Sequence, residues 1–120
     1  MAVQHYHGSC QCGAVEFEAD LDVDQAVTCN CSRCRRLGSV FAFTPTAGFR
    51  QTKGEGRLTE YRFNKMVIAH QFCPVCGIEP FGMGVAPDGS TMVAVNVRTL
   101  EGVDSHALAK VAHHYDGASM

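Results

Sequence analysis

The sequence predicts a mainly β domain that binds zinc and contains little helix. Three observations support this prediction: short β-branched and aromatic runs recur along the chain, turn-forming residues separate them, and seven cysteines fall in three tight groups. Hydrophobic residues make up 46 % of the chain and charged residues 18 %, which is ordinary for a folded domain. Because no long linker interrupts the 120 residues, we expect residues 1–120 to form a single domain.

The clearest predicted strand covers residues 14–20, where apolar Val15, Phe17 and Ala19 alternate with acidic residues. Such alternation places the apolar side chains on one face of a half-buried strand. Similar runs predict four more strands, at residues 40–44, 58–63, 66–72 and 91–97. Four aromatic residues on these runs should enter the core: Phe41, Phe43, Phe63 and Phe72.

Turn signals between the predicted strands favour a mostly antiparallel arrangement. Asn64-Lys65 lies between two of the runs and Asp88-Gly89 precedes another, and both pairs are typical of hairpin turns. Only two segments are candidates for a helix. One covers residues 31–38, with Ser32 as a possible N-cap, and the weaker one covers residues 103–111.

The charge and the sequence ends exclude several classes of partner. A net charge of −2 and an isoelectric point near 6.3 offer no basic surface for nucleic acid. The N-terminal residues show no secretion signal, and no apolar run approaches the length of about 18 residues that a membrane span needs. We therefore expect a cytoplasmic protein that binds neither nucleic acid nor membranes.

The seven cysteines should be metal ligands. An odd number cannot pair completely within one chain, and disulfides are disfavoured in the cytoplasm. The cysteines occur as Cys10-x-Cys12, Cys29-x-Cys31-x-x-Cys34 and Cys73-x-x-Cys76. Residues two apart on a strand share a face, so Cys10 with Cys12 and Cys29 with Cys31 can each act as a pair. Thiolate groups this dense indicate Zn²⁺.

Spacing leaves two ways to divide these ligands. A ribbon-type site would join Cys31 and Cys34 to Cys73 and Cys76, which leaves three cysteines without a role. The other division joins Cys10 and Cys12 to Cys73 and Cys76, and leaves Cys29, Cys31 and Cys34 as a compact trio. Both are chemically sound.

The chain resembles the glutathione-dependent formaldehyde-activating enzyme family, to which vertebrate centromere protein V is also similar. The resemblance runs from about Gly8 to Asp104 and is carried by GSCQCGAVEFE, CNCSRCRRLGS, FCPVCG and VNVRTLEGVD. It implies antiparallel sheets pinned by zinc, often described as a β-tent. It also implies two metal sites: a structural zinc on Cys10, Cys12, Cys73 and Cys76, and a second, reactive zinc on Cys29, Cys31 and Cys34.

Three protein ligands leave one position of a tetrahedral zinc for water or substrate, which is typical of catalytic sites. The resemblance implies that glutathione binds there as a thiolate, beside a small carbonyl such as formaldehyde. We therefore expect a zinc-dependent enzyme of the carbon–sulfur lyase type, with glutathione as co-substrate, that forms or cleaves a glutathione–aldehyde adduct such as S-hydroxymethylglutathione. The alternative function is a non-enzymatic, zinc-stabilised binding module.

Charged residues near the trio are candidate substrate contacts. Guanidinium groups of Arg33, Arg35 or Arg36 could pair with the glutathione carboxylates, and solvated arginines are the alternative. Histidines are not expected to bind metal, because a four-cysteine site needs no nitrogen ligand: this applies to His7, His70, His113 and His114. The family resemblance leads us to expect a small or hydroxyl residue early in the run that follows the last cysteine. This chain has IEPF there, at residues 78–81.

Overall fold

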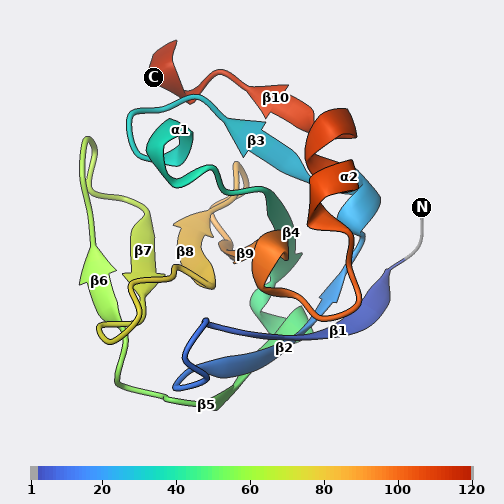
Figure 1. The fold of residues 1–120 in the computed structure, drawn as a ribbon. Helices are drawn as coiled ribbons and strands as arrows, with labels where there is room; N and C mark the ends of the chain where they lie inside the picture. Colours follow the sequence, from blue (N-terminus) through green and yellow to red (C-terminus); the bar gives the residue numbers. More distant parts are fainter. Residues whose placement is uncertain (1–2, 120) are drawn as a thin grey trace.

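The computed structural model describes residues 3–119 and contains two β-sheets (Figure 1). The strands are β1 (Gln4–Ser9), β2 (Glu16–Leu21), β3 (Val27–Cys29), β4 (Phe41–Pro45), β5 (Phe49–Lys53), β6 (Thr59–Tyr61), β7 (Ala69–Phe72), β8 (Phe81–Val85), β9 (Thr91–Asn96) and β10 (His113–Tyr115). The helices are α1 (Cys34–Leu37), α2 (Ser105–Val111) and the 3₁₀ turns η1 (Val23–Gln25), η2 (Thr46–Gly48), η3 (Val97–Thr99) and η4 (Gly117–Ser119). The prediction of a mainly β fold with little helix is therefore confirmed.

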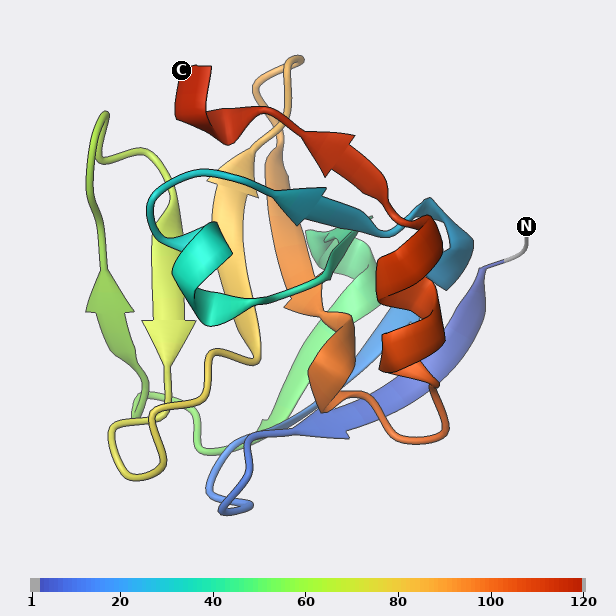
Figure 2. The same cartoon turned by 45° about the horizontal axis from the view of Figure 1, so that its top comes forward.

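The smaller sheet has the strand order β1-β2-β5, and the larger has the order β10-β3-β4-β9-β8-β7-β6. Neighbouring strands are antiparallel except β10, which runs parallel to β3. Figure 2 shows the smaller sheet crossing beneath the larger one, with α2 beside β3 and α1 directly after it. Among residues 3–119, no helix is long and apolar enough to cross a membrane.

The core lies between the two sheets. Phe17, Ala19 and Leu21 of β2 are buried, while the acidic residues between them point outward, as the alternation predicted. The Phe17 ring lies against Phe49 of β5 and Phe81 of β8, with ring centroids 5.6 and 5.7 Å away. Gly8 of β1 pairs with Phe17, and a Cβ there would collide with the phenyl ring. Aromatic packing thus joins the smaller sheet to the larger one.

Each of the five predicted strands overlaps an observed strand: β2, β4, β6, β7 and β9. Strands β2 and β4 begin and end one or two residues later than predicted, and the other three are shorter. The Asp88-Gly89 turn joins β8 to β9, with Gly89 at a φ of +88°. The β6–β7 pair is antiparallel as Asn64-Lys65 predicted, but its connection is longer and covers residues 62–68. Strands β1, β3, β5, β8 and β10 were not predicted. Most are short or lie at a sheet edge, where one or both faces meet solvent and the sequence shows little alternation.

Two local predictions are wrong: the N-cap of the first helix and the burial of three of the four phenylalanines. Helix α1 begins at Cys34 after Arg33, and Ser32 does not cap it; instead the Cys31 Sγ accepts a hydrogen bond from the Cys34 backbone N–H at 3.3 Å. The predicted second helix is confirmed as α2, which Asp104 caps through the Ala107 N–H. Of the four phenylalanines predicted for the core, only Phe41 is buried. Phe43 is 51 % exposed, and Phe63 and Phe72 are partly buried outside the core cluster.

Candidate metal centres

The first cysteine cluster forms where two turns meet. Cys10 and Cys12 lie in the turn between β1 and β2, and Cys73 and Cys76 lie in the turn that follows β7. In each turn, a backbone carbonyl accepts an N–H from a glycine of positive φ: Gly13 bonds to the Cys10 carbonyl and Gly77 to the Cys73 carbonyl. Cys10 and Cys12 therefore come together through a turn, and not through a shared strand face as predicted.

The spacing of these four sulfurs fits a tetrahedral zinc ion. All four Sγ atoms lie within 4.8 Å of one another, and the Cys12 Sγ is 3.7 Å from those of both Cys10 and Cys73. Zn–S bonds of about 2.3 Å place tetrahedral sulfur ligands about 3.8 Å apart. With four sulfurs, a tetrahedral ion would have no position left for a substrate. This cluster is therefore suited to a structural role.

The acidities of the thiols in this cluster are spread widely. Burial raises the pKa of Cys76, but backbone N–H groups of Ile78 and Cys12 and neighbouring thiols outweigh it and lower the pKa to about 6. The Ala14 N–H lowers the pKa of Cys12, yet burial and contacts with the other thiols raise it to about 11. Closely spaced thiolates repel one another, and this hinders ionisation of the last members. A divalent cation would relieve that repulsion.

The second cluster consists of Cys29, Cys31 and Cys34, whose Sγ atoms also lie within 4.8 Å of one another. Cys29 ends β3, Cys31 lies in the turn, and Cys34 begins α1 and is buried. Burial raises the pKa of the Cys31 thiol, but N–H groups of Cys34 and Arg33 outweigh this effect and lower it. Burial and the two neighbouring thiols raise the pKa of Cys34. Three sulfurs fit a tetrahedral ion that keeps one position for a further ligand.

The structure thus groups the cysteines as the family resemblance implies. In residues 3–119, no group of cysteines close enough to hold one metal ion combines Cys31 and Cys34 with Cys73 and Cys76, as the ribbon-type site would require. Metal ligation by either group stays a prediction.

A cavity of about 360 Å³ opens beside the trio. It is lined by Thr28, Cys29, Asn30, Arg35, His114, Tyr115 and Asp116. Its far wall is the C-terminal segment, which Asn30 holds in place: the Asn30 Nδ2 donates to Asp116 and its Oδ1 accepts from the Ala118 N–H. A larger cavity of about 480 Å³ touches Cys12, but that cysteine belongs to the four-sulfur cluster. The cavity at Cys29 is therefore the better place for a substrate.

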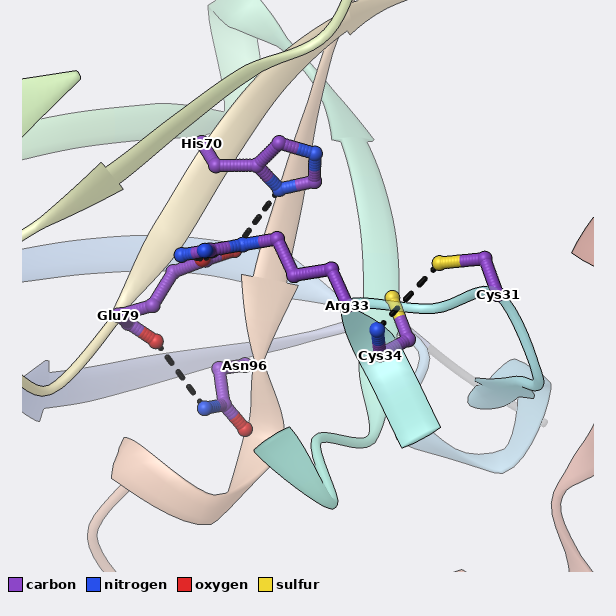
Figure 3. A network of polar contacts seen from close by, with 6 residues as sticks. All are labelled: Cys31, Arg33, Cys34, His70, Glu79 and Asn96. Carbon is purple, nitrogen blue, oxygen red and sulfur yellow. Dashed lines mark hydrogen bonds and ion pairs between the residues drawn. The ribbon is translucent and has the colours of Figure 1, made fainter. Parts of the chain in front are cut away.

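The structure separates the three arginines. Arg35 lines the cavity, and among the described residues its guanidinium group makes no hydrogen bond or ion pair. Arg36 is exposed and donates to the Ser32 carbonyl. The Arg33 side chain points away from Cys31 and Cys34 toward Glu79 (Figure 3). It binds the Glu79 carboxylate, with Nη2 2.6 Å from Oε1. Of the three arginines predicted to contact a substrate, Arg35 is the one that lines this cavity, and the contact itself stays a prediction.

Glu79 is the site residue that the sequence analysis did not assign. Its side chain is 1 % exposed, and it accepts from Arg33 and faces the His70 Nδ1 at 3.4 Å. The Arg33 guanidinium lies over the rings of Tyr61 and Phe72, at 5.0 and 6.0 Å from their centroids. The sequence does contain an indication of this role: residues 78–81 (IEPF) differ from the family pattern, and a glutamate between apolar residues requires a partner if it is buried.

His70, His113 and His114 belong to neither cysteine cluster, although His114 lines the cavity beside Cys29. His70 is buried beside Glu79, and its ring stacks on Phe63. His113 and His114 belong to β10, and the His114 Nδ1 is 2.5 Å from the Thr28 hydroxyl.

Two sheets joined through a four-cysteine cluster, with a three-cysteine cluster beside a cavity, define a small β protein with two candidate zinc sites. The chain belongs to the glutathione-dependent formaldehyde-activating enzyme family, which matches residues 5–117. It is also similar to the crystal structure of a Rhodobacter sphaeroides protein, a structural-genomics target. The two chains are 36 % identical with a TM-score of 0.79, and the match covers 89 % of this chain and 98 % of that chain. The predicted family and fold are confirmed.

Proposed function

We propose that the protein is a carbon–sulfur lyase-type enzyme that forms or cleaves an adduct of glutathione with a small aldehyde. The observation that carries the proposal is the trio of Cys29, Cys31 and Cys34, which offers three sulfurs to a metal and opens on a cavity lined by Arg35. The family's name connects it with glutathione and formaldehyde. Zinc bound by the trio would supply a fourth position for a thiolate sulfur.

The cavity has charges that complement glutathione. Arg35 is free to pair with a carboxylate, and Asp116 on the opposite wall can accept the α-ammonium group. Hydrogen bonds from Ser119 and Asn30 lower the pKa of Asp116, which keeps this carboxylate ionised at neutral pH. The two side chains would therefore orient the tripeptide with its sulfur toward Cys29.

The reaction itself needs only the thiol and the aldehyde. The sulfur forms a bond to the carbonyl carbon, the C=O π electrons move to oxygen, and the thiol proton ends on that oxygen. Cleavage reverses each step. Because both reactants lie in one cavity, the protein contributes mainly by holding them at bonding distance.

Exchange NMR at saturating glutathione tests this proposal. Zinc-loaded wild-type protein should speed the exchange between formaldehyde and S-hydroxymethylglutathione above the background rate. Cys31→Ala should not, and Arg35→Ala should be slower than Arg36→Ala, its matched control. Equal exchange with and without wild-type protein would contradict the proposal and favour the zinc-stabilised binding module.

The proposed location is the cytoplasm. All seven cysteines are free thiols in the structure, and a glutathione-dependent reaction needs the reduced tripeptide. The proposed partner is accordingly a small thiol or its aldehyde adduct, and not a nucleic acid or a membrane.

A further inference from the structure

The outer face of the smaller sheet carries a cluster of metal-ligating side chains without cysteine. His5 and His7 lie two apart on β1 and therefore share a face. In the antiparallel β1–β2 pair, His5 is opposite Asp20 and His7 is opposite Glu18. The four side chains thus gather on the face that points away from the core.

Three of these residues bring their ligand atoms together. His5, His7 and Glu18 each offer one ligand atom, and these three atoms lie within 4.8 Å of one another. The His5 Nε2 is 2.8 Å from the Glu18 Oε1, and the two imidazole rings are 5.3 Å apart between centroids. Two imidazoles and a carboxylate, fixed by strand pairing, form a ligand set for a divalent metal.

Asp20 gives the cluster a second layer. Its Oδ1 lies 2.8 Å from the His5 Nδ1. A carboxylate that accepts from Nδ1 fixes the tautomer and the orientation of a histidine ring, and a metal bound between Nε2 and Glu18 would replace the present hydrogen bond between these two groups. The other oxygen of Glu18, Oε2, accepts from the Arg50 Nη2 at 3.0 Å, and this contact orients the carboxylate.

We propose that His5, His7 and Glu18 form a third metal site, for a divalent transition metal that favours imidazole, such as Ni²⁺ or Zn²⁺, with Asp20 as the positioning residue. His7 then has a metal role, contrary to the sequence expectation. The site is independent of the cysteine clusters and of the proposed enzyme activity, since it uses no thiol.

The test uses protein whose cysteine clusters have first been saturated with zinc, with Ni²⁺ as the probe. Substoichiometric Ni²⁺ should broaden the imidazole NMR signals of His5 and His7 before those of the other histidines, and zinc analysis should show no zinc released. His7→Ala should weaken Ni²⁺ binding by at least tenfold, and Asp20→Asn by about 10- to 100-fold. His106→Ala, an exposed histidine on α2, is the matched control and should bind as wild type does.

The substitutions should not unfold the protein, because His5 and His7 are exposed, and near-UV dichroism checks that each variant is folded. Equal affinity of wild type and His7→Ala would overturn the proposal. Uniform broadening of all histidines, or binding that occurs only with release of zinc, would do the same.

Discussion

Gly117 controls how closely the C-terminal segment approaches the trio. A Cβ at this position would lie 2.5 Å from the Cys29 Sγ and 3.1 Å from the Cys31 Cβ. Gly117→Ala should therefore displace Cys29 and lower the zinc content by one equivalent, while the domain stays folded. Metal analysis together with near-UV dichroism measures both effects. Ala118→Gly, one residue further along, is the control and should keep its zinc. Full zinc content in Gly117→Ala would show that the segment does not touch the metal site.

The Arg33–Glu79 ion pair fixes the turn of the trio to the larger sheet. Removing one partner leaves a buried charge unpaired, which destabilises by about 3–5 kcal/mol in buried pairs. Arg33→Ala and Glu79→Ala should each lower the free energy of unfolding by about 3 kcal/mol, measured by denaturant titration of zinc-saturated protein. The double variant should lose less than the sum, by at least about 1 kcal/mol. Additive losses would contradict a direct interaction, and Arg36→Ala, within about 0.5 kcal/mol of wild type, controls for general charge effects.

At the scale of elements, the sequence predicted strands where one face is buried and turns where glycine or asparagine is required. Strand β2 was evident because Val15, Phe17 and Ala19 alternate with acidic residues. One of these, Glu18, bonds to β1 and β5. Strand β1 was not evident, because its His5 and His7 face solvent and its role emerges only when it pairs with β2. A short polar strand depends on its neighbours, and these are not encoded in the local pattern.

The pairing of β1 with β2 should depend on pH through His5. Hydrogen bonds to Asp20 and then to Glu18 raise the pKa of His5 above 6.5. A histidine whose pKa is higher in the folded state than in the unfolded state stabilises the fold at pH values below its unfolded-state pKa. This stabilisation is lost as the pH rises through the folded-state pKa. The difference in unfolding free energy between wild type and His5→Asn, both holding only the two zinc equivalents of the cysteine clusters, should therefore be larger at pH 6 than at pH 9. A difference that grows with pH would contradict the assignment.

At the scale of the whole molecule, spacing alone could not divide the cysteines. The β1–β2 turn and the turn after β7 are 61 residues apart at Cys12 and Cys73, and only the packing of the two sheets brings these sulfurs within 3.7 Å. The pairing of the buried Glu79 with Arg33 could not be predicted from spacing either, because the two residues lie 46 positions apart in the sequence. The family resemblance indicated the right grouping because it carries information on tertiary structure.

The two clusters should contribute differently to stability. The four-cysteine cluster joins the smaller sheet to the larger one, so Cys76→Ser should unfold or aggregate, because zinc binding at a structural site is folding free energy. Cys31→Ala should lose one zinc equivalent and remain folded. Near-UV dichroism and metal analysis compare the two variants. Native dichroism and wild-type melting in Cys76→Ser would contradict the structural role of the four-cysteine cluster. Unfolding of both variants would contradict the claim that only this cluster is needed for folding.

Calorimetric titration of zinc-loaded protein with glutathione tests most directly whether the trio is an open thiolate site. If the sulfur occupies the fourth position, binding must release the thiol proton, so measurements in buffers of different ionisation enthalpy should show net proton release near neutral pH. S-methylglutathione keeps both carboxylates but has no ionisable thiol, and it should bind at least tenfold more weakly. The account predicts binding of glutathione with proton release in wild type, and its loss in Cys31→Ala. Equal binding of the two tripeptides, or no binding of glutathione, would contradict it.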